Sequence, residues 1–169
     1  MASGVYFISK PILKKGLIFE QKDQDKKVYI IGNEGPVINV VLNPGDTVIF
    51  KKIIFMHSGN NMMTRFKENA PNEPKYIMKP CKKQLAEFEI HPMTDTIVFV
   101  HQGGLIMKDC VLSMRSLPKN LKSKLSCIIA MPETELNFNN CEFLGNETNH
   151  DCGIISLNAD STVSSCSFN

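Results

Sequence analysis

Short apolar runs, three to eight residues long, recur along the whole chain and are separated by turns rich in glycine, asparagine, proline and aspartate. They cover residues 5–8, 17–19, 28–31, 37–42, 48–55, 97–100, 105–112, 127–131 and 154–157. Valine, isoleucine and phenylalanine dominate these runs, and such residues favour strands. Helical periodicity is confined to Pro80–Glu89, where Leu85 and Phe88 lie three residues apart. The pattern predicts an all-β protein with at most one short helix.

Four segments repeat one arrangement of apolar positions: TVIFKKIIF, GLIMKDCVL, ELNFNNCEF and STVSSCSF. Aligned, they give four columns, which hold Val48, Leu105, Leu136 and Ser161; Phe50, Met107, Phe138 and Val163; Ile53, Cys110, Cys141 and Cys166; and Phe55, Leu112, Phe143 and Phe168. Within each pair of columns the spacing is two, the period of a strand. The step of three between the pairs predicts a bend, so each segment is expected to form two strands with their apolar side chains facing inward.

The repeat predicts a solenoid. Its first-column residues lie 57, 31 and 25 positions apart, which indicates a unit of about 25 residues with insertions. A unit of a few short strands cannot bury its own apolar face, so it stacks on copies of itself. Consecutive coils then pair as parallel strands, with right-handed crossovers. We expect one domain over residues 1–169, with an inserted loop at residues 58–94.

Three strings within the repeat carry a resemblance to a known fold: IIGNEGPVINV, TVIFKKIIFMH and ELNFNNCEFLGN. They resemble the coils of the right-handed parallel β-helix superfamily, the pectate-lyase-like fold, in which an apolar-x-apolar-x-x-Cys/Ile-x-Phe string ending in Gly-Asn recurs once per coil. The resemblance covers roughly residues 28–57 and 95–169. The sequence departs from it in the insert Ser58–Thr94 and in stopping inside a coil at Asn169, which fits the N-terminal part of a longer solenoid and would expose a strand edge.

Superfamily members that act on polysaccharides work on the outer face of one sheet, with carboxylates that bind calcium or act as acid and base, or with a Lys or Arg base. The residues expected to face outward here are Ile49, Ile106, Asn137 and Thr162; Lys51, Lys108, Asn139 and Ser164; and Lys52, Asp109, Asn140 and Ser165. A single aspartate among them gives no carboxylate pair and no metal site. His101 could reach Asp95 or Asp109, although a turn histidine bonded to water is the simpler interpretation. We therefore predict a protein that is not an enzyme and that has no cofactor or metal.

The six cysteines are Cys81, Cys110, Cys127, Cys141, Cys152 and Cys166. They form no CxxC pair and no Cys/His cluster with zinc-finger spacing. Three of them fall in an inward column, where a thiol packs as a small hydrophobe. Buried free thiols are the expectation.

Charge is distributed unevenly along the chain, although the net charge is only +2. Residues 1–124 hold all 19 Lys and Arg against 11 acids, and residues 125–169 hold six acids and no base. The amino terminus has no secretory signal, and no apolar run reaches the ~20 residues of a membrane span. The expected address is cytoplasmic, with a cytoskeletal or ciliary site as the more specific expectation, and no membrane partner is expected.

Two stretches have the composition of contact surfaces. Ser113–Lys124 carries four bases and no acid; the bases are Arg115, Lys119, Lys122 and Lys124. It is either a solvated loop or a docking segment for an acidic surface such as a tubulin tail, a phosphorylated partner or RNA. RNA is the weakest of these because the stretch has no aromatic residue for base stacking. The insert Ser58–Thr94 is the other stretch, with apolar residues that could pack on the solenoid or on a neighbour.

These observations favour a non-enzymatic β-helix that serves as a rigid scaffold for protein–protein contacts in an intracellular assembly. It resembles the solenoid parts of Shc-binding and F-box adaptor proteins and of cytoskeletal scaffolds. The partner-binding residues are expected to be Arg115, Lys119, Lys122 and Lys124, and the partner to be a protein with an acidic surface. The alternatives are a carbohydrate-active β-helix enzyme and a basic module that binds RNA or phosphorylated proteins.

Overall fold

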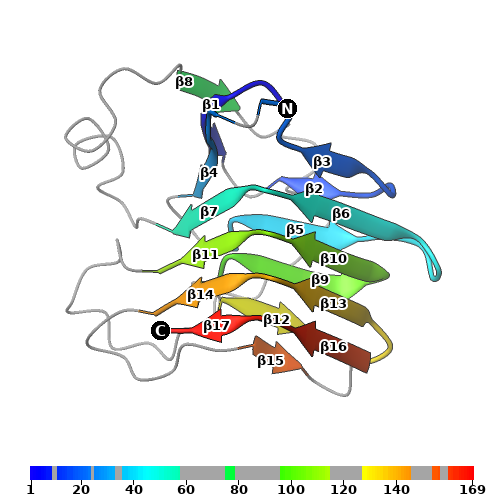
Figure 1. The fold of residues 1–169 in the computed structure, drawn as a ribbon. Helices are drawn as coiled ribbons and strands as arrows, with labels where there is room; N and C mark the ends of the chain where they lie inside the picture. The colour runs from blue at the N-terminus through cyan, green and yellow to red at the C-terminus, as the bar shows by residue number, and fades with distance from the viewer. Residues whose placement is uncertain are drawn as a thin grey trace, which may run out of the picture.

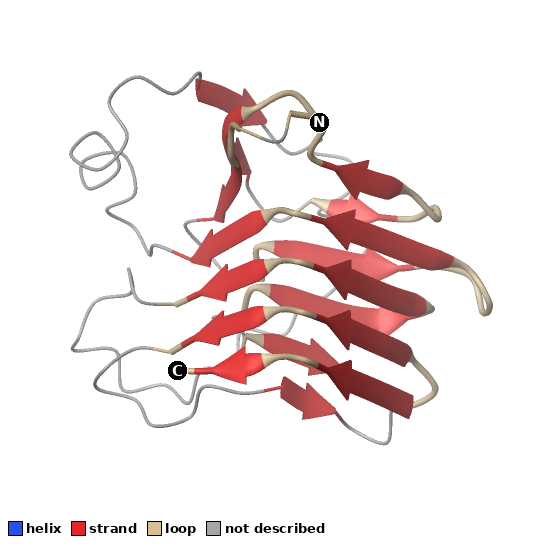
Figure 2. Cartoon of the chain, in the orientation of Figure 1, coloured by secondary structure: helices blue, strands red, loops and turns tan. Residues whose placement is uncertain are grey.

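The computed structural model describes residues 1–8, 11–23, 25–32, 36–57, 75–78, 96–114, 127–145, 154–156 and 160–169, with the backbone alone for 75–78 and 154–156. In these residues every regular element is a strand and none is a helix (Figure 2). The prediction of an all-β chain is confirmed for this part of the protein. The short helix expected at Pro80–Glu89 lies outside the described residues.

The strands form three parallel sheets. Sheet A holds, in spatial order, β17 (Ser167–Phe168), β14 (Glu142–Leu144), β11 (Val111–Ser113), β7 (Ile54–His57), β4 (Val28–Gly32), β1 (Gly4–Ile8) and β8 (Lys75–Met78). Sheet B holds β15 (Ile154–Ser156), β12 (Ile128–Ala130), β9 (Val98–Gln102), β5 (Ile38–Val41) and β2 (Ile12–Leu13). Sheet C holds β16 (Asp160–Ser164), β13 (Glu135–Asn139), β10 (Gly104–Lys108), β6 (Thr47–Lys51) and β3 (Ile18–Glu20).

Apart from β8 in the insert, which adds a second strand to sheet A after β7, the chain visits the sheets in a fixed order, A, then B, then C, and repeats that circuit from β1 to β16. Each circuit is one coil, and the five coils are β1–β2–β3, β4–β5–β6, β7–β9–β10, β11–β12–β13 and β14–β15–β16, followed by β17. The coils lie one above another, with the two ends of the chain at opposite ends of the stack (Figure 1). The arrangement is consistent with a β-helix-like solenoid.

Strand register confirms the four columns predicted from the repeat. Val48 pairs with Leu105, Leu105 with Leu136, and Leu136 with Ser161 in sheet C. The second column follows two residues later in the same strands. In sheet A, Phe55, Leu112, Phe143 and Phe168 form the fourth column.

The bend between the two halves of the repeat has a left-handed backbone in four consecutive coils. The residues at this position and their φ angles are Lys52 (56°), Asp109 (53°), Asn140 (52°) and Ser165 (52°). One left-handed residue turns the chain sharply from sheet C into sheet A, which is why the inward columns on either side are three residues apart rather than two. The four residues that follow are Ile53, Cys110, Cys141 and Cys166, the third column.

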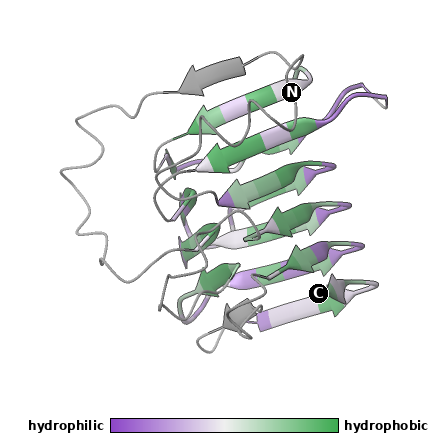
Figure 3. Ribbon diagram, turned by 90° about the vertical axis from the view of Figure 1, so that its left-hand side faces the viewer, coloured by the Kyte–Doolittle hydropathy of each residue, from purple (hydrophilic) through white to green (hydrophobic). Residues whose placement is uncertain are grey.

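The core lies between the three sheets and is built from the columns. Phe50 and Phe55 meet edge to face, with ring centroids 5.1 Å apart, and Phe138 and Phe143 repeat this contact two coils later at 5.7 Å. All four rings are fully buried. Figure 3 shows hydrophobic residues along the stacked strands and hydrophilic residues gathered at the turns. Burial of these columns is the main force that holds the coils together.

Two parts of the stack were not recognised in the repeat. The first coil ends in Leu17–Glu20, whose register with Val48–Lys51 places Phe19 on Phe50, 5.0 Å away and stacked. The insert contributes β8, which pairs with β1 at the end of sheet A. Lys75–Met78 of the insert is thus joined to the solenoid by strand pairing, and the remainder of the insert lies outside the described residues.

Candidate functional site

The long connections of the chain all run from sheet A to sheet B. In the last three coils these connections are residues 58–97, 114–127 and 145–153. The connections from sheet C to sheet A are two residues in each of the last four bends. Insertions therefore accumulate at one corner of the stack, which we call the A–B corner.

The segments leave sheet A from adjacent, fixed positions. Met56 pairs with Ser113, and Ser113 with Leu144, so β7, β11 and β14 end side by side. The Met114 N–H donates to the Leu144 carbonyl over 2.8 Å, and the Met114 side chain is buried. His57, where the insert begins, is buried as well.

The first two segments also return at adjacent positions. Thr96, at the end of the insert, donates a hydrogen bond from Oγ1 to the Cys127 carbonyl over 3.0 Å. The Ile97 N–H donates to the same oxygen over 3.0 Å. Thr96, Ile97 and Cys127 are fully buried. The described residues at both ends of the insert and of the following segment are thus buried in the core, and these ends lie side by side in sheets A and B.

The four predicted partner-binding residues, Arg115, Lys119, Lys122 and Lys124, lie outside the described residues. Their segment is the A–B connection of the fourth coil, between the insert in the third coil and residues 146–153 in the fifth. The latter segment carries two acids and no Lys or Arg. The described residues that flank the predicted basic segment are Met114 and Cys127.

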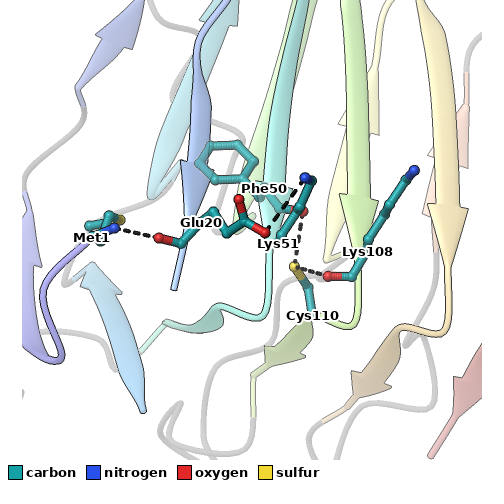
Figure 4. A network of polar contacts seen from close by, with 6 residues as sticks. All are labelled: Met1, Glu20, Phe50, Lys51, Lys108 and Cys110. Carbon is teal, nitrogen blue, oxygen red and sulfur yellow. Dashed lines mark hydrogen bonds and ion pairs between the residues drawn. The ribbon is translucent and has the colours of Figure 1, made fainter. Parts of the chain in front are cut away.

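A second surface is the outer face of sheet C. Ile18, Ile49 and Ile106 form one outward column across β3, β6 and β10. Ile18 is 63% exposed. The next outward column holds Glu20, Lys51 and Lys108, and the Lys51 ammonium lies 3.6 Å from Oε1 of Glu20 (Figure 4). Further along the same face, Asn137, Asn139, Thr162 and Ser164 replace the isoleucines and lysines.

This face has a shallow hollow of about 240 Å³, lined mainly by Thr47, Gly104, Ile106, Glu135, Asn137 and Asp160. Gly104, in its lining, leaves no room for a side chain, because a Cβ on this residue would stand 2.7 Å from Oγ1 of Thr47. Glu135 and Asp160 are register partners at one side. The outward columns predicted from the sequence start at Ile49 and do not include this one; the alignment of Gly104 with Thr47 and Glu135 is the signal that could have revealed it. The lining can donate and accept hydrogen bonds to a polar group.

The structure corrects the position of His101, the histidine considered for catalysis, which was expected in a turn. His101 belongs to strand β9 and not to a turn, and its Nε2 lies 3.2 Å from Oδ1 of Asn39. Its ring contacts Phe99, with centroids 4.1 Å apart, and desolvation by burial lowers the pKa of His101. Asp109 instead accepts a hydrogen bond from Nδ2 of Asn140. The other suggested partner, Asp95, lies outside the described residues.

Among the described residues, no group of three or more His, Cys, Asp or Glu side chains is arranged to hold a metal ion. Within the same part of the chain, no helix has the length and apolar character needed to cross a membrane. Comparisons with protein-family models, with curated proteins and with solved structures gave no significant match.

Proposed function

We propose that this protein is a right-handed parallel β-helix of the pectate-lyase-like type that works as a non-enzymatic scaffold and binds an acidic protein partner at the A–B corner. The observation that carries the proposal is the placement of the three longest connections, which leave the stack from neighbouring strands of one sheet. A rigid framework that carries variable loops on one side is a common design for recognition.

The stack suits this role because its coils are tied together along three parallel ladders and a continuous apolar core. Loops that begin and end on buried residues such as Met114 and Cys127 are held at both ends, so less ordering is required when a partner binds. Shape is thus supplied by the coils, and specificity by the segments between them.

The positive charge of the basic segment indicates an acidic partner. Residues 115–126 contain four bases and no acid, which favours an acidic surface. The segment has no aromatic residue, and sequence-tolerant binding of single-stranded nucleic acid relies on base stacking. An acidic protein is therefore preferred to RNA. Within the cell, a cytoskeletal or ciliary assembly is the more specific proposal.

Two carboxylates on the outer side of sheet C are already engaged by neighbouring side chains, which supports a non-enzymatic role for them. Glu20 is paired with Lys51, and Asp109 is bonded to Asn140 in the next coil. Glu135 and Asp160 are adjacent carboxylates beside a shallow hollow, with no third His, Cys, Asp or Glu grouped with them in the described part of the chain. Polysaccharide cleavage generally requires two carboxyl groups in distinct roles across the substrate bond, so Glu135 and Asp160 are the pair that the carbohydrate-active alternative would have to use.

The proposal is tested by neutralising the basic segment. Arg115, Lys119, Lys122 and Lys124 are changed to Gln together, and a matched control changes Lys15, Lys22, Lys26 and Lys27, which are exposed in the first coil and its turn. Partners retained by the tagged wild-type protein at moderate salt are quantified by mass spectrometry. We expect retention to fall only in the segment variant, with thermal stability unchanged. Retention should also fall as salt rises, since exposed charges are screened over about 8 Å at physiological ionic strength.

Equal retention by both variants would contradict binding through the basic segment. The carbohydrate-active alternative predicts instead that the wild-type protein turns over a polysaccharide. Turnover in a broad screen that is lost on changing Asp109 to Asn, and is kept by the segment variant, would overturn the scaffold proposal.

A further inference from the structure

Three cysteines form a column at the bend between sheet C and sheet A. Cys110, Cys141 and Cys166 occupy equivalent positions in consecutive coils, each directly after a residue with positive φ. The Glu142 N–H donates to the Cys110 carbonyl over 2.9 Å, and the Ser167 N–H donates to the Cys141 carbonyl over 3.0 Å. These bonds fix the three residues in register, one coil apart.

The three sulfurs point the same way. Each Sγ lies against the carbonyl two residues earlier, at 3.3 Å from Lys108, 3.4 Å from Asn139 and 3.3 Å from Ser164. Cys110 Sγ also lies 3.5 Å from the Phe50 carbonyl of the preceding coil (Figure 4). Neighbours in adjacent strands are about 4.8 Å apart. That separation falls within the roughly 4.4–6.8 Å between Cα atoms of bridged cysteines, and a disulfide would require the Cβ atoms to approach to about 3.5–4.5 Å.

The column is asymmetric in its exposure. Cys110 and Cys141 are 1% and 2% exposed, whereas Cys166 is only half-buried. The Cys141 N–H lies 3.4 Å from the Cys166 sulfur, which holds that sulfur against the backbone of Cys141. An oxidant that approaches from solvent therefore meets Cys166 first, and the nearest thiol to it in the column is Cys141.

Cys110 prepares Cys141 for reaction. A hydrogen bond from the Cys110 thiol lowers the pKa of Cys141 to about 7, against the opposing effect of burial. The same hydrogen bond, together with desolvation, raises the pKa of Cys110. The lowered pKa of Cys141 favours its thiolate, which is the nucleophilic form of a cysteine.

We propose that Cys166 and Cys141 form a redox site that takes a hydroperoxide, with Cys166 as the first sulfur oxidised and Cys141 as the sulfur that resolves it to a disulfide. Cys110 is a positioning residue in this site, since it acts through Cys141. The proposal does not depend on the scaffold function.

The chemistry balances without another reactant. The Cys166 thiolate attacks one oxygen of hydrogen peroxide, the O–O bond breaks, and Cys166 becomes a sulfenic acid while hydroxide leaves. The Cys141 sulfur then attacks the Cys166 sulfur, an S–S bond forms, and a second hydroxide leaves. The two thiol protons convert both hydroxides to water, so two thiols and one peroxide give one disulfide and two waters.

The bridge joins residues 25 positions apart and ties the last bend of the stack to the one before it. A disulfide across such a loop restricts the unfolded chain. Oxidation is therefore expected to raise the thermal unfolding midpoint, and a thiol reductant should reverse the rise.

The experiment treats the reduced, folded protein with hydrogen peroxide and reads the products by intact mass and peptide mapping. We expect a mass lower by two hydrogens and a Cys141–Cys166 cross-link. The Cys141→Ser variant should instead add oxygen atoms at Cys166. The Cys127→Ser variant is the matched control and should behave as wild type, because Cys127 is buried at the start of β12 and lies outside the column.

The role of Cys110 is tested by measuring how the product of peroxide oxidation depends on pH. In wild type the disulfide should dominate down to about pH 7, the pKa of Cys141. In the Cys110→Ala variant, the pH above which the disulfide replaces over-oxidised Cys166 should rise toward 9. The Cys110→Ser variant keeps a hydrogen-bond donor and should return this pH to the wild-type value. Over-oxidation of wild-type Cys166 with Cys141 left reduced, or a cross-link through any other cysteine, would overturn the proposal.

Discussion

Asn140 donates a hydrogen bond from Nδ2 to Oδ1 of Asp109 over 2.7 Å, and the two residues occupy the same position in consecutive coils. Both have a left-handed backbone, with φ of 52° and 53°. Asn and Asp adopt this conformation more readily than other non-glycine residues. The pair therefore combines the backbone shape that turns sheet C into sheet A with a side-chain link between coils.

Replacing Asn140 with Ala should lower the free energy of unfolding by about 1–2 kcal/mol. The left-handed backbone conformation costs more free energy for Ala than for Asn, and Ala cannot form the hydrogen bond to Asp109. Urea unfolding measures the change. Asn139→Ala is the control, since Asn139 is an exposed neighbour in β13 whose φ is not positive. Equal losses at the two positions would mean that the bend does not depend on Asn140.

The bend and the columns could be predicted from the sequence because both are local. Phe138 and Cys141 show their inward direction by spacing alone, and the structure places them in the core. The first coil was harder, because Leu17–Glu20 repeats the first half of the unit, and Lys22 and Gln24 then stand where the two apolar residues of the second half are expected. A degenerate coil of this kind is recognised only when neighbouring strands supply its register.

The candidate site could be predicted only in part. The composition of residues 113–124 indicated a contact segment, but the bond that brings the described ends of this segment and of the insert together joins Thr96 to the Cys127 carbonyl, 31 residues along the chain. Pairing of β8 with β1 is equally long-range, since Tyr76 meets Tyr6. Periodicity reports which residues face inward along one strand, and it carries no information about which distant strand lies beside it.

Phe138 should be among the most costly residues to truncate. It is fully buried and contacts Phe143 edge to face. Phe138→Ala should cost roughly 3–5 kcal/mol of unfolding free energy, through lost burial and the cavity that remains. Asn137→Ala, on the exposed outer face, should be nearly silent. Chemical denaturation measures the unfolding free energy of both variants, and similar losses of stability would contradict the inside–outside alternation of β13.

Thiol alkylation should distinguish the cysteines by their depth. Cys110 and Cys141 should resist a small alkylating reagent in the native protein and react after unfolding, because their side chains are buried. Cys166, which is half-buried, should react sooner than both. Mass spectrometry of timed, quenched samples follows each site. Rapid native labelling of Cys110 and Cys141 would show that the column does not face the core.

His101 should make the fold less stable as the pH falls. Burial lowers its pKa below 6.5, so below that pH the unfolded chain takes up a proton that the folded protein does not. Stability from this residue is therefore present above about pH 6.5 and declines on acidification. His101→Gln removes the titration and keeps a donor for Asn39, with the other ionisable groups left in place in both proteins. Urea unfolding at several values between about pH 7.5 and 5.5 should show wild type losing stability relative to the variant; a constant difference, or a gain by wild type at low pH, would contradict the shift.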